Sequence, residues 1–466
     1  MKKSNIILLG IVFLCLSFAL LSFFHVDPDY YWHIKVGEVI TKTGIVNHDL
    51  FSWTMQGKYW MSHEWLFEVL LYGFQWVFGK YHAVVYCLSN FLLLFTILLL
   101  TNYQSYLKNI AYTIVYLLFF GILSLGFIQA RPYLLSFLLL GITIYLLFDL
   151  YNHSESKKIY LLPIITIIWA NIHGGSSNLP YLFCFIFGIV GMVSFQFKKI
   201  ESKKLKKKQI HRYFIVMILC IISVCMNPHG IKMLFYPYVN MADSTMINSI
   251  HEWQSSSLHI PFHYTYFVFL LFLLFTFLFS SKRIQFIDLI LFLICTYLGL
   301  KSIRFWLFTP IIMSYVIFSY VEVKKIRGFT SSLIILSIFF ISIFLCHNSI
   351  SPNQYNGNIS TDALSILKKA KPKRLFNEYK FGGELIYHDV FVFIDGRADL
   401  YSGTIYNDYL SIINFKKEAI SLIEKYDFDY YLISDKCSLY TYLDNSDQFD
   451  LIYSDKNIYF YKKIVN

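Results

Sequence analysis

Residues 132–150 read Pro132-Tyr-Leu-Leu-Ser-Phe-Leu-Leu-Leu-Gly-Ile-Thr-Ile-Tyr-Leu-Leu-Phe-Asp149-Leu150, and Asp149 is the only charged residue among them. An apolar run of about 20 residues can cross the hydrocarbon core of a bilayer as a helix. Comparable runs recur along most of this 466-residue chain, in which 56% of residues are hydrophobic and 15% are charged. Soluble domains carry about 25% charged residues, so the composition predicts a polytopic α-helical membrane protein.

The apolar runs predict about eleven transmembrane helices. The run 5–24 follows Lys2-Lys3 and lacks a small-residue cleavage site, which favours a retained first helix over a signal peptide. The run 65–78 is short and contains Glu68, so we expect an interfacial helix in the first outer loop. The other predicted spans are 82–101, 109–128, 132–150, 159–170, 179–197, 213–226, 264–280, 284–300, 305–320 and 330–346.

The basic residues predict the orientation of these helices. The net charge is +11, and the excess lies in short loops. Cytoplasmic loops are enriched in Lys and Arg, so we expect a cytoplasmic N-terminus. Since topology explains the charge, it does not indicate nucleic-acid binding. The loops that agree with this register lie at Lys108, 157–158, 198–212, 282–283 and 324–327.

The chain changes character after residue 346, where no further run is long enough to span. We predict a transmembrane domain at 1–346 and a small extracytoplasmic α/β domain at 347–466, because about 120 residues suffice for one domain. Segments 390–394, 430–433 and 458–461 have the composition of strands. Segments 361–369 and 416–426 have the pattern of amphipathic helices.

The predicted topology places every polar motif of the membrane domain at an outer helix end or in an outer loop. Their convergence on one face indicates a single site that opens to the non-cytoplasmic side. The eight cysteines have neither a paired framework nor metal-ligand spacing. The residues that converge are Asp29, His33, Glu64, Arg131, His173, His229, Glu252 and Arg304.

The first outer loop is rich in acids, including Asp27, Asp29 and Glu64. An acid beside a membrane exit can act as a general base, because a water-poor cleft raises its pKa toward the working range. A second acid could join it in binding a divalent cation such as Mg²⁺ or Mn²⁺. The alternative is a structural loop in which Asp29 caps a helix over 30–41.

Two arginines, Arg131 and Arg304, link predicted spans at the outer face. An arginine at this depth is costly unless it is paired or hydrated, and its planar fork suits phosphate oxygens. The alternative is snorkelling toward lipid headgroups. His173, His229 and the pair Glu252-Trp253 lie on the same side, although a lone histidine at a helix end is more often a cap than a ligand.

Two predicted spans, 159–170 and 213–226, cover only about 18–21 Å at about 1.5 Å per residue. Each ends in a polar turn, at 169–175 and 226–230. Polar backbone at membrane depth is tolerated only inside protein or beside water, so we infer an outward-facing cavity floored by these turns. Alternatively, the helices continue and the turns lie at the interface.

Short motifs along the chain carry a family resemblance. They are Asp29-Tyr-Tyr-Trp32-His33 with Gly37, Asp49-Leu-Phe51-Ser52-Trp53-Thr54, Glu64-Trp65-Leu66, Trp169-Ala-Asn171-Ile-His173-Gly174, Asn227-Pro228-His229-Gly230, Glu252-Trp253, Gly382-Gly383 and Asp395-Gly396-Arg397. Together they resemble a family of bacterial polytopic membrane proteins, and the resemblance implies a location in the bacterial cytoplasmic (inner) membrane. That family is similar in plan to the C-superfamily glycosyltransferases, which include protein O-mannosyltransferases, aminoarabinose transferases and oligosaccharyltransferase catalytic subunits. Gly382-Gly383 is no phosphate loop, and Asp395-Gly396-Arg397 has the composition of a turn.

The resemblance implies an inverting transfer of a sugar from a polyprenyl-phosphate donor to a glycan, lipid or protein acceptor. Asp29 best matches the acid after the first helix, followed by Asp27, and Arg304 then Arg131 match the arginines that hold the donor phosphate. Pro28 separates the two acids, whereas the mannosyltransferase-like branch carries adjacent Asp and Glu. The remaining candidate residues, expected to line the substrate cavity, are His33, His173, His229, Glu252 and Trp253.

Two other functions fit the composition. A transporter or flippase for a lipid-linked sugar would usually place broken helices and ionisable groups near the midplane, often in repeated halves. The predicted spans are nearly free of central charge and show no repeat, which disfavours this function. A non-catalytic envelope assembly protein that presents its C-terminal domain to a partner is the third alternative.

Overall fold

The computed structural model describes Phe24 and residues 26–108, 110–240, 251–321, 359–455 and 458–464. The chain divides into two compact units. The first comprises Met1–Phe24, Ala83–Ala242 and Ile247–Ser351, and the second comprises His25–His82, Asp243–Met246 and Pro352–Asn466. The predicted spans 5–24 (apart from Phe24) and 330–346 lie outside the described residues.

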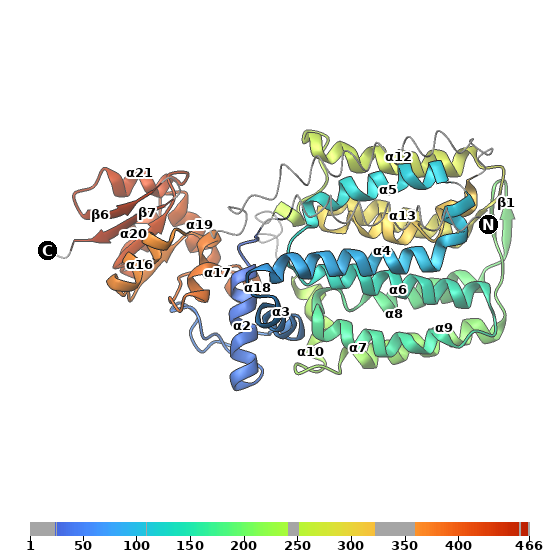
Figure 1. The fold of residues 1–466 in the computed structure, drawn as a ribbon, viewed down its shortest axis with the longest axis horizontal. Helices are drawn as coiled ribbons and strands as arrows, with labels where there is room; N and C mark the ends of the chain where they lie inside the picture. The colour runs from blue at the N-terminus through green and yellow to red at the C-terminus, as the bar shows by residue number, and fades with distance from the viewer. Residues whose placement is uncertain are drawn as a thin grey trace. The chain divides into compact units, whose positions relative to one another are not determined.

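The first unit is helical, and its long helices run roughly alongside one another (Figure 1). Short 3₁₀ segments connect many of them. The helices are α4 (His82–Lys108), α5 (Ile110–Ser124), η2 (Leu125–Phe127), α6 (Tyr133–Asn152), η3 (Lys158–Leu161), α7 (Leu162–Ile172), η4 (Gly174–Ser176), α8 (Leu179–Met192), α9 (Lys207–Val224), α10 (Lys232–Asn240), η5 (His251–Trp253), η6 (Pro261–His263), α12 (Tyr264–Phe279), α13 (Phe286–Lys301), η7 (Ile303–Phe305), α14 (Phe308–Met313) and η8 (Ile317–Tyr320).

Several helices of the described chain have the length and composition of membrane spans. Four qualify on both criteria, namely Trp65–Asn102, Tyr133–Asn152, Gly174–Met192 and Pro261–Phe279. Shorter apolar helices cover Tyr112–Phe127, Lys158–Ile172 and Ile303–Met313. The chain is therefore mostly helical with several membrane-length helices, while the count of eleven spans and their orientation stay predictions.

Two predicted spans differ from the structure. The predicted span 305–320 is broken into η7, α14 and η8, and Ser314 and Ser319 donate to the carbonyls of Ile311 and Val316 at 2.7 Å. Such side-chain bonds compete with the helical ladder. The predicted span 179–197 ends at Met192, because the chain turns into a small sheet of β1 (Phe195–Phe197), β2 (Ile200–Ser202) and β3 (Ile284–Gln285).

The second unit begins with two packed helices, α2 (Tyr30–Thr43) and α3 (Trp65–Phe78). A Cβ atom at Gly37 would come within 2.1 Å of the Glu68 carbonyl oxygen, so only glycine lets these helices approach so closely. The apolar run that contains α3 is interrupted at Gly79, where φ is +52°, and continues as η1 (Gly79–Tyr81) and α4. An interfacial position for α3 stays a prediction.

The C-terminal part of the second unit is a small mixed α/β region, as predicted. Its sheet has the order β4-β5-β7-β6, with β4 parallel to β5 and the other pairs antiparallel. The predictions at 361–369, 416–426, 430–433 and 458–461 correspond to α16, α20, β5 and β7. The elements are α16 (Thr361–Ala370), β4 (Leu375–Asn377), α17 (Tyr379–Tyr387), α18 (Ala398–Tyr401), α19 (Thr404–Ile413), α20 (Ala419–Tyr426), β5 (Tyr430–Ile433), α21 (Ser438–Asp444), β6 (Phe449–Ser454) and β7 (Tyr459–Lys463).

The strand predicted at 390–394 is wrong. The backbone of Val392 bonds to that of Phe51 and Trp53 in the first outer loop, at 3.2 and 3.1 Å. The Asn377 side chain accepts from the Phe393 N–H and donates to the Ile394 carbonyl, both at 2.8 Å. The segment therefore satisfies its backbone groups with a side chain and a distant loop instead of a neighbouring strand.

A buried ion cluster ties the first outer loop to the C-terminal part of this unit. The Arg397 guanidinium contacts the Asp49 carboxylate at 2.7 Å. It also donates two hydrogen bonds to the Asp395 carboxylate, of 2.8 and 2.7 Å. All three side chains are inaccessible to solvent. The Arg397 guanidinium also lies over the ring of Trp60, 4.8 Å from its centroid. A desolvated charge stays charged only when it is paired and hydrogen-bonded in this way.

We expect Arg397→Met to destabilise the second unit by about 3–5 kcal/mol, since Asp49 and Asp395 would be left buried without their counter-ion. The measurement is the thermal midpoint of the purified protein. The control is Arg374→Ala, which removes an exposed pair with Asp427 and should leave the midpoint nearly unchanged, because solvent screens such a pair. Equal midpoints for the two variants would contradict the cluster's role.

Candidate functional site

The first unit gathers several of the predicted site residues around Arg304, which lies in η7. Its guanidinium bonds to His173 Nε2 at 3.0 Å and lies 3.9 Å from a Glu252 carboxylate oxygen. It also lies over the ring of Trp253, 5.6 Å from the centroid. The Arg304 side chain keeps 29% of its surface exposed, so it is held in place but accessible.

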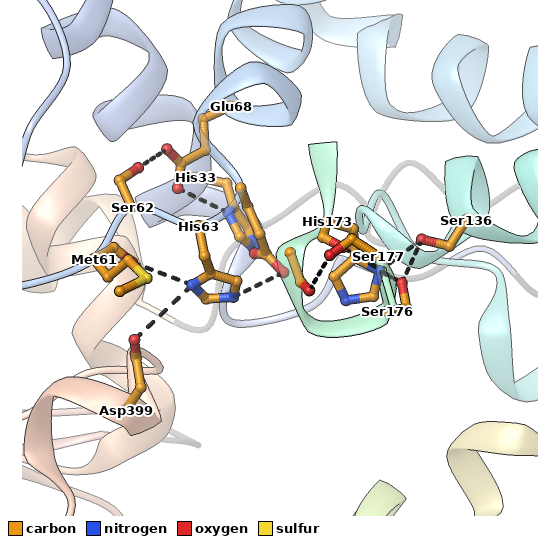
Figure 2. Close-up of polar contacts among 12 residues, drawn as sticks. His33, Met61, Ser62, His63, Glu68, Ser136, His173, Ser176, Ser177 and Asp399 are labelled. Carbon is orange, nitrogen blue, oxygen red and sulfur yellow. Dashed lines mark hydrogen bonds and ion pairs between the residues drawn. The ribbon is translucent and has the colours of Figure 1, made fainter. Parts of the chain in front are cut away.

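The contact with Arg304 fixes the protonation of His173. A guanidinium can only donate, so Nε2 accepts and the proton of the neutral ring is on Nδ1. Nδ1 lies 2.7 Å from Ser136 Oγ and 3.0 Å from Ser176 Oγ, which can accept a hydrogen bond from the Nδ1–H (Figure 2). The buried Trp169 indole donates to the same two hydroxyls at 3.1 and 2.9 Å. His173 is therefore a buried, oriented acceptor for Arg304.

This network arises where α7 ends. His173 leaves the helix in an extended conformation, and Gly174–Ser176 forms the single turn η4 before α8 begins. The Asn171 side chain donates to the Met226 carbonyl at 3.0 Å and so joins the two polar turns that the sequence singled out. An aqueous cavity above these turns stays a prediction.

Two further candidates of the first unit lie in the turns that precede α6 and α10. Arg131 is half-buried just before α6, and its carbonyl accepts from Tyr86 Oη at 3.1 Å. His229 is half-buried in the turn before α10, where its N–H donates to Asn227 Oδ1 at 2.7 Å. Their predicted parts in donor and substrate binding stay predictions.

In the second unit, the acids Asp27 and Asp29 lie at the start of α2. Asp27 is buried, and its Oδ1 accepts from the Asp29 N–H at 2.8 Å. Asp29 occupies the N-cap position, but its side chain makes no capping bond to the helix. The alternative that Asp29 serves as a helix cap is therefore not supported.

A carboxylate–histidine cluster lies beside α2 and α3 (Figure 2). His33 is fully buried, with Nε2 3.7 Å from Glu64 and Nδ1 3.5 Å from Glu68. The Ser62 hydroxyl donates to Glu68 at 2.9 Å. His63 lies 3.3 Å from Glu64 and 3.9 Å from Asp399. His33 and Glu64, predicted from the sequence, thus share one buried network.

The charges around His63 hold a proton on its ring. Burial works against that proton, but the Glu64 carboxylate outweighs burial with help from Asp399 and raises the pKa of His63 to about 9. The positive ring bridges the first outer loop to α18. Among the described residues, no group of three or more His, Cys, Asp or Glu has an arrangement that could hold a metal ion.

The structure thus groups the predicted site residues into two sets. Arg304, His173, Glu252 and Trp253 come together in the first unit, while Asp27 contacts Asp29 and His33 contacts Glu64 in the second. The prediction that the acids and the arginines share one pocket joins residues of both units and stays a prediction. The site residues predicted from the sequence did not include Ser136, Ser176, His63, Glu68, Asp399 or Arg397, although Arg397 belongs to the motif Asp395-Gly396-Arg397. An isolated hydroxyl in an apolar helix, such as that of Ser136, carries no signal of its partner.

A solved structure has a similar overall fold. It is the apo form of an oligosaccharyltransferase from Archaeoglobus fulgidus, with a TM-score of 0.57 and 11% identity over 93% of this chain and 70% of that chain. No protein-family model matches the sequence, and no curated protein matches it. The chain therefore shares its overall fold with that protein, while membership in the C-superfamily of glycosyltransferases and in a bacterial family stay predictions.

We expect the stability of the second unit to fall as the pH rises from about 6.5 to about 9. The folded-state pKa of His63 lies above its usual value of about 6.5, so its contribution is complete below that value and is lost through the folded pKa. Thermal midpoints of the wild type and of His63→Gln should converge toward pH 9.5. A constant difference across this range would contradict the bridge.

Proposed function

We propose that the chain is a membrane glycosyltransferase that moves a sugar from a polyprenyl-phosphate donor to an envelope acceptor on the extracytoplasmic side. The single observation that carries the proposal is the held and accessible Arg304 guanidinium, in a chain with this fold. The proposed donor is defined only by its chemical class, a sugar linked to a polyprenyl phosphate.

Arg304 has the chemistry of a phosphate ligand. Its planar fork offers five N–H donors, and the bond to neutral His173 uses only one of them. Glu252, at 3.9 Å, is too distant for a tight bidentate pair. The guanidinium can therefore bind a further anion besides the Glu252 carboxylate. We assign His173 the role of a positioning residue for Arg304. Arg131 is the second candidate for the donor phosphate.

Asp29 is the proposed base. Its carboxylate would take the proton from the acceptor hydroxyl while the hydroxyl oxygen bonds to the anomeric carbon of the donor sugar. The bond from that carbon to the phosphate oxygen breaks, and polyprenyl phosphate leaves with the electron pair. Arg304 would stabilise the charge on the departing phosphate, a contribution of the kind that usually dominates catalysis. Asp27 would hold the backbone of Asp29, as its bond to the Asp29 N–H suggests.

The proposed reaction does not depend on a divalent cation. In the mannosyltransferase-like branch the acids are adjacent, whereas here Pro28 separates them. Asp27 already accepts a backbone N–H with one oxygen. The proposal therefore assigns the neutralisation of the donor phosphate to arginine.

The first test uses farnesyl phosphate, which carries the isoprenoid and the phosphate but no sugar. We expect Arg304→Gln to weaken its binding about tenfold or more, because one charge-assisted contact is worth about 1.5–3 kcal/mol. His173→Ala should weaken it less, through loss of orientation. The measurement is isothermal titration of the purified protein. The control is Arg283→Gln, in a basic loop predicted to be cytoplasmic; equal loss in both arginine variants would contradict the assignment.

The second test concerns Asp29 in the cell. We expect a deletion strain to lack one sugar on an envelope glycan, by mass spectrometry, and the wild-type gene to restore it. Asp29→Asn should fail to restore it at equal protein level while farnesyl phosphate binding is kept, since the amide cannot accept the proton. Asp450→Asn, at an exposed position in β6, is the control. If Asp29→Asn restores the sugar but truncation after residue 346 does not, the result would favour an assembly protein. Ion-gradient-dependent flux of a lipid-linked sugar in vesicles would favour a transporter.

A further inference from the structure

Two glycines of the C-terminal region enclose the Pro28-Asp29 step of the first outer loop. Gly383 lies in α17, and a Cβ atom there would come within 2.2 Å of the Pro28 carbonyl oxygen. Gly396 precedes α18, and a Cβ atom there would lie 1.5 Å from Asp29 Oδ1, 2.4 Å from Cγ and 3.0 Å from Oδ2. Both sites therefore admit no side chain in the present arrangement.

The two glycines do not meet the same kind of neighbour. Gly383 approaches backbone, so a substitution there would force two chain segments apart. Gly396 approaches the end of the Asp29 side chain, which can rotate away. Gly396 does not have a positive φ, so its backbone conformation does not require glycine. The close approach of the Asp29 carboxylate does.

The position of Gly396 is fixed from both sides. Its neighbours Asp395 and Arg397 belong to the buried ion cluster that also holds Asp49. On the α2 side, the Asp29 N–H is held by Asp27 Oδ1 at 2.8 Å. Gly396, which is flanked by two residues of the ion cluster, thus faces a carboxylate whose own backbone N–H is hydrogen-bonded. Such support is what holds a reacting group to within a fraction of an ångström.

We propose that Gly396 is a positioning residue for the Asp29 carboxylate, a role that rests on the proposed function of Asp29 as the base. Because Gly396 has no side chain, Asp29 Oδ1 can occupy the space that a Cβ atom would fill. This space accommodates the present rotamer of Asp29. Through the motif Asp395-Gly396-Arg397, the C-terminal region thereby contributes to the proposed reaction. Arg397 fixes the motif to Asp49 of the first outer loop, and Gly396 leaves room for the Asp29 carboxylate.

A double-variant cycle tests the seat without any assay of transfer. Gly396→Ala should lower the thermal midpoint by roughly 2–4 °C, because the methyl group displaces the Asp29 carboxylate. In the background of Asp29→Ala the same substitution should cost nothing, since the displaced atoms are gone. Gly73→Ala is the matched control, because a Cβ atom at that helical glycine meets no atom within 4 Å. An equal cost in both backgrounds overturns the proposal.

The consequence for the reaction is measured as sugar incorporation by membranes of the complemented deletion strain. Gly396→Ala should lower the initial rate per protein about 10²-fold, the effect of misplacing a reacting group by about 1 Å. The dissociation constant of farnesyl phosphate should stay within about twofold, because Arg304 is unaltered. A merely destabilised protein would lose both together, and an unchanged rate overturns the proposal.

The cycle and the rate separate the two hypotheses. If wild-type membranes incorporate sugar and Asp29→Asn does not, a full rate in Gly396→Ala refutes the positioning role alone. If the wild type incorporates none, the proposed function fails, and the midpoints still decide whether Gly396 seats Asp29.

Discussion

The buried contact of Arg397 with Asp49 and Asp395 is the interaction on which the second unit depends. It joins the loop before α3 to the turn before α18, two segments that are far apart in sequence. A desolvated guanidinium needs both carboxylates, so neither segment can leave without exposing or stranding a charge. The region around Asp29 is consequently built from the first outer loop and the C-terminal region together, and Gly396, Gly383 and Val392 all contact that loop.

A second constraint acts in the first unit, where the donor-only chemistry of arginine determines the state of its neighbour. Because Arg304 donates to His173 Nε2, the ring must be neutral, and its single N–H, on Nδ1, donates a hydrogen bond to Ser136 or Ser176. The indole of Trp169 completes the bonding of these hydroxyls. The Arg304 guanidinium is thereby held beside the end of α7, and its bond to His173 uses one of its five N–H donors. This arrangement supports the proposed binding of a phosphate.

This protein resembles a solved structure in its fold but hardly in its sequence. The match to the Archaeoglobus fulgidus oligosaccharyltransferase extends over 93% of the chain at 11% identity. A fold shared at that level shows the scaffold, and function has to be argued from the site. In this chain the proposed function depends on Arg304 of the first unit, which His173 holds in place, and on Asp29 of the second.

The sequence by itself determined the helical membrane character, the small α/β region after residue 346, and most helix positions, because apolar run length and amphipathic period are local properties that a chain displays directly. It also selected Arg304, His173, Glu252 and Trp253, which the fold brings together. Only the tertiary structure decided that segment 390–394 contacts the first outer loop instead of joining the sheet, that Ser136 orients His173, and that Gly396 faces Asp29. Each of these is a contact between residues tens to hundreds of positions apart, and such contacts leave no periodic mark in the chain.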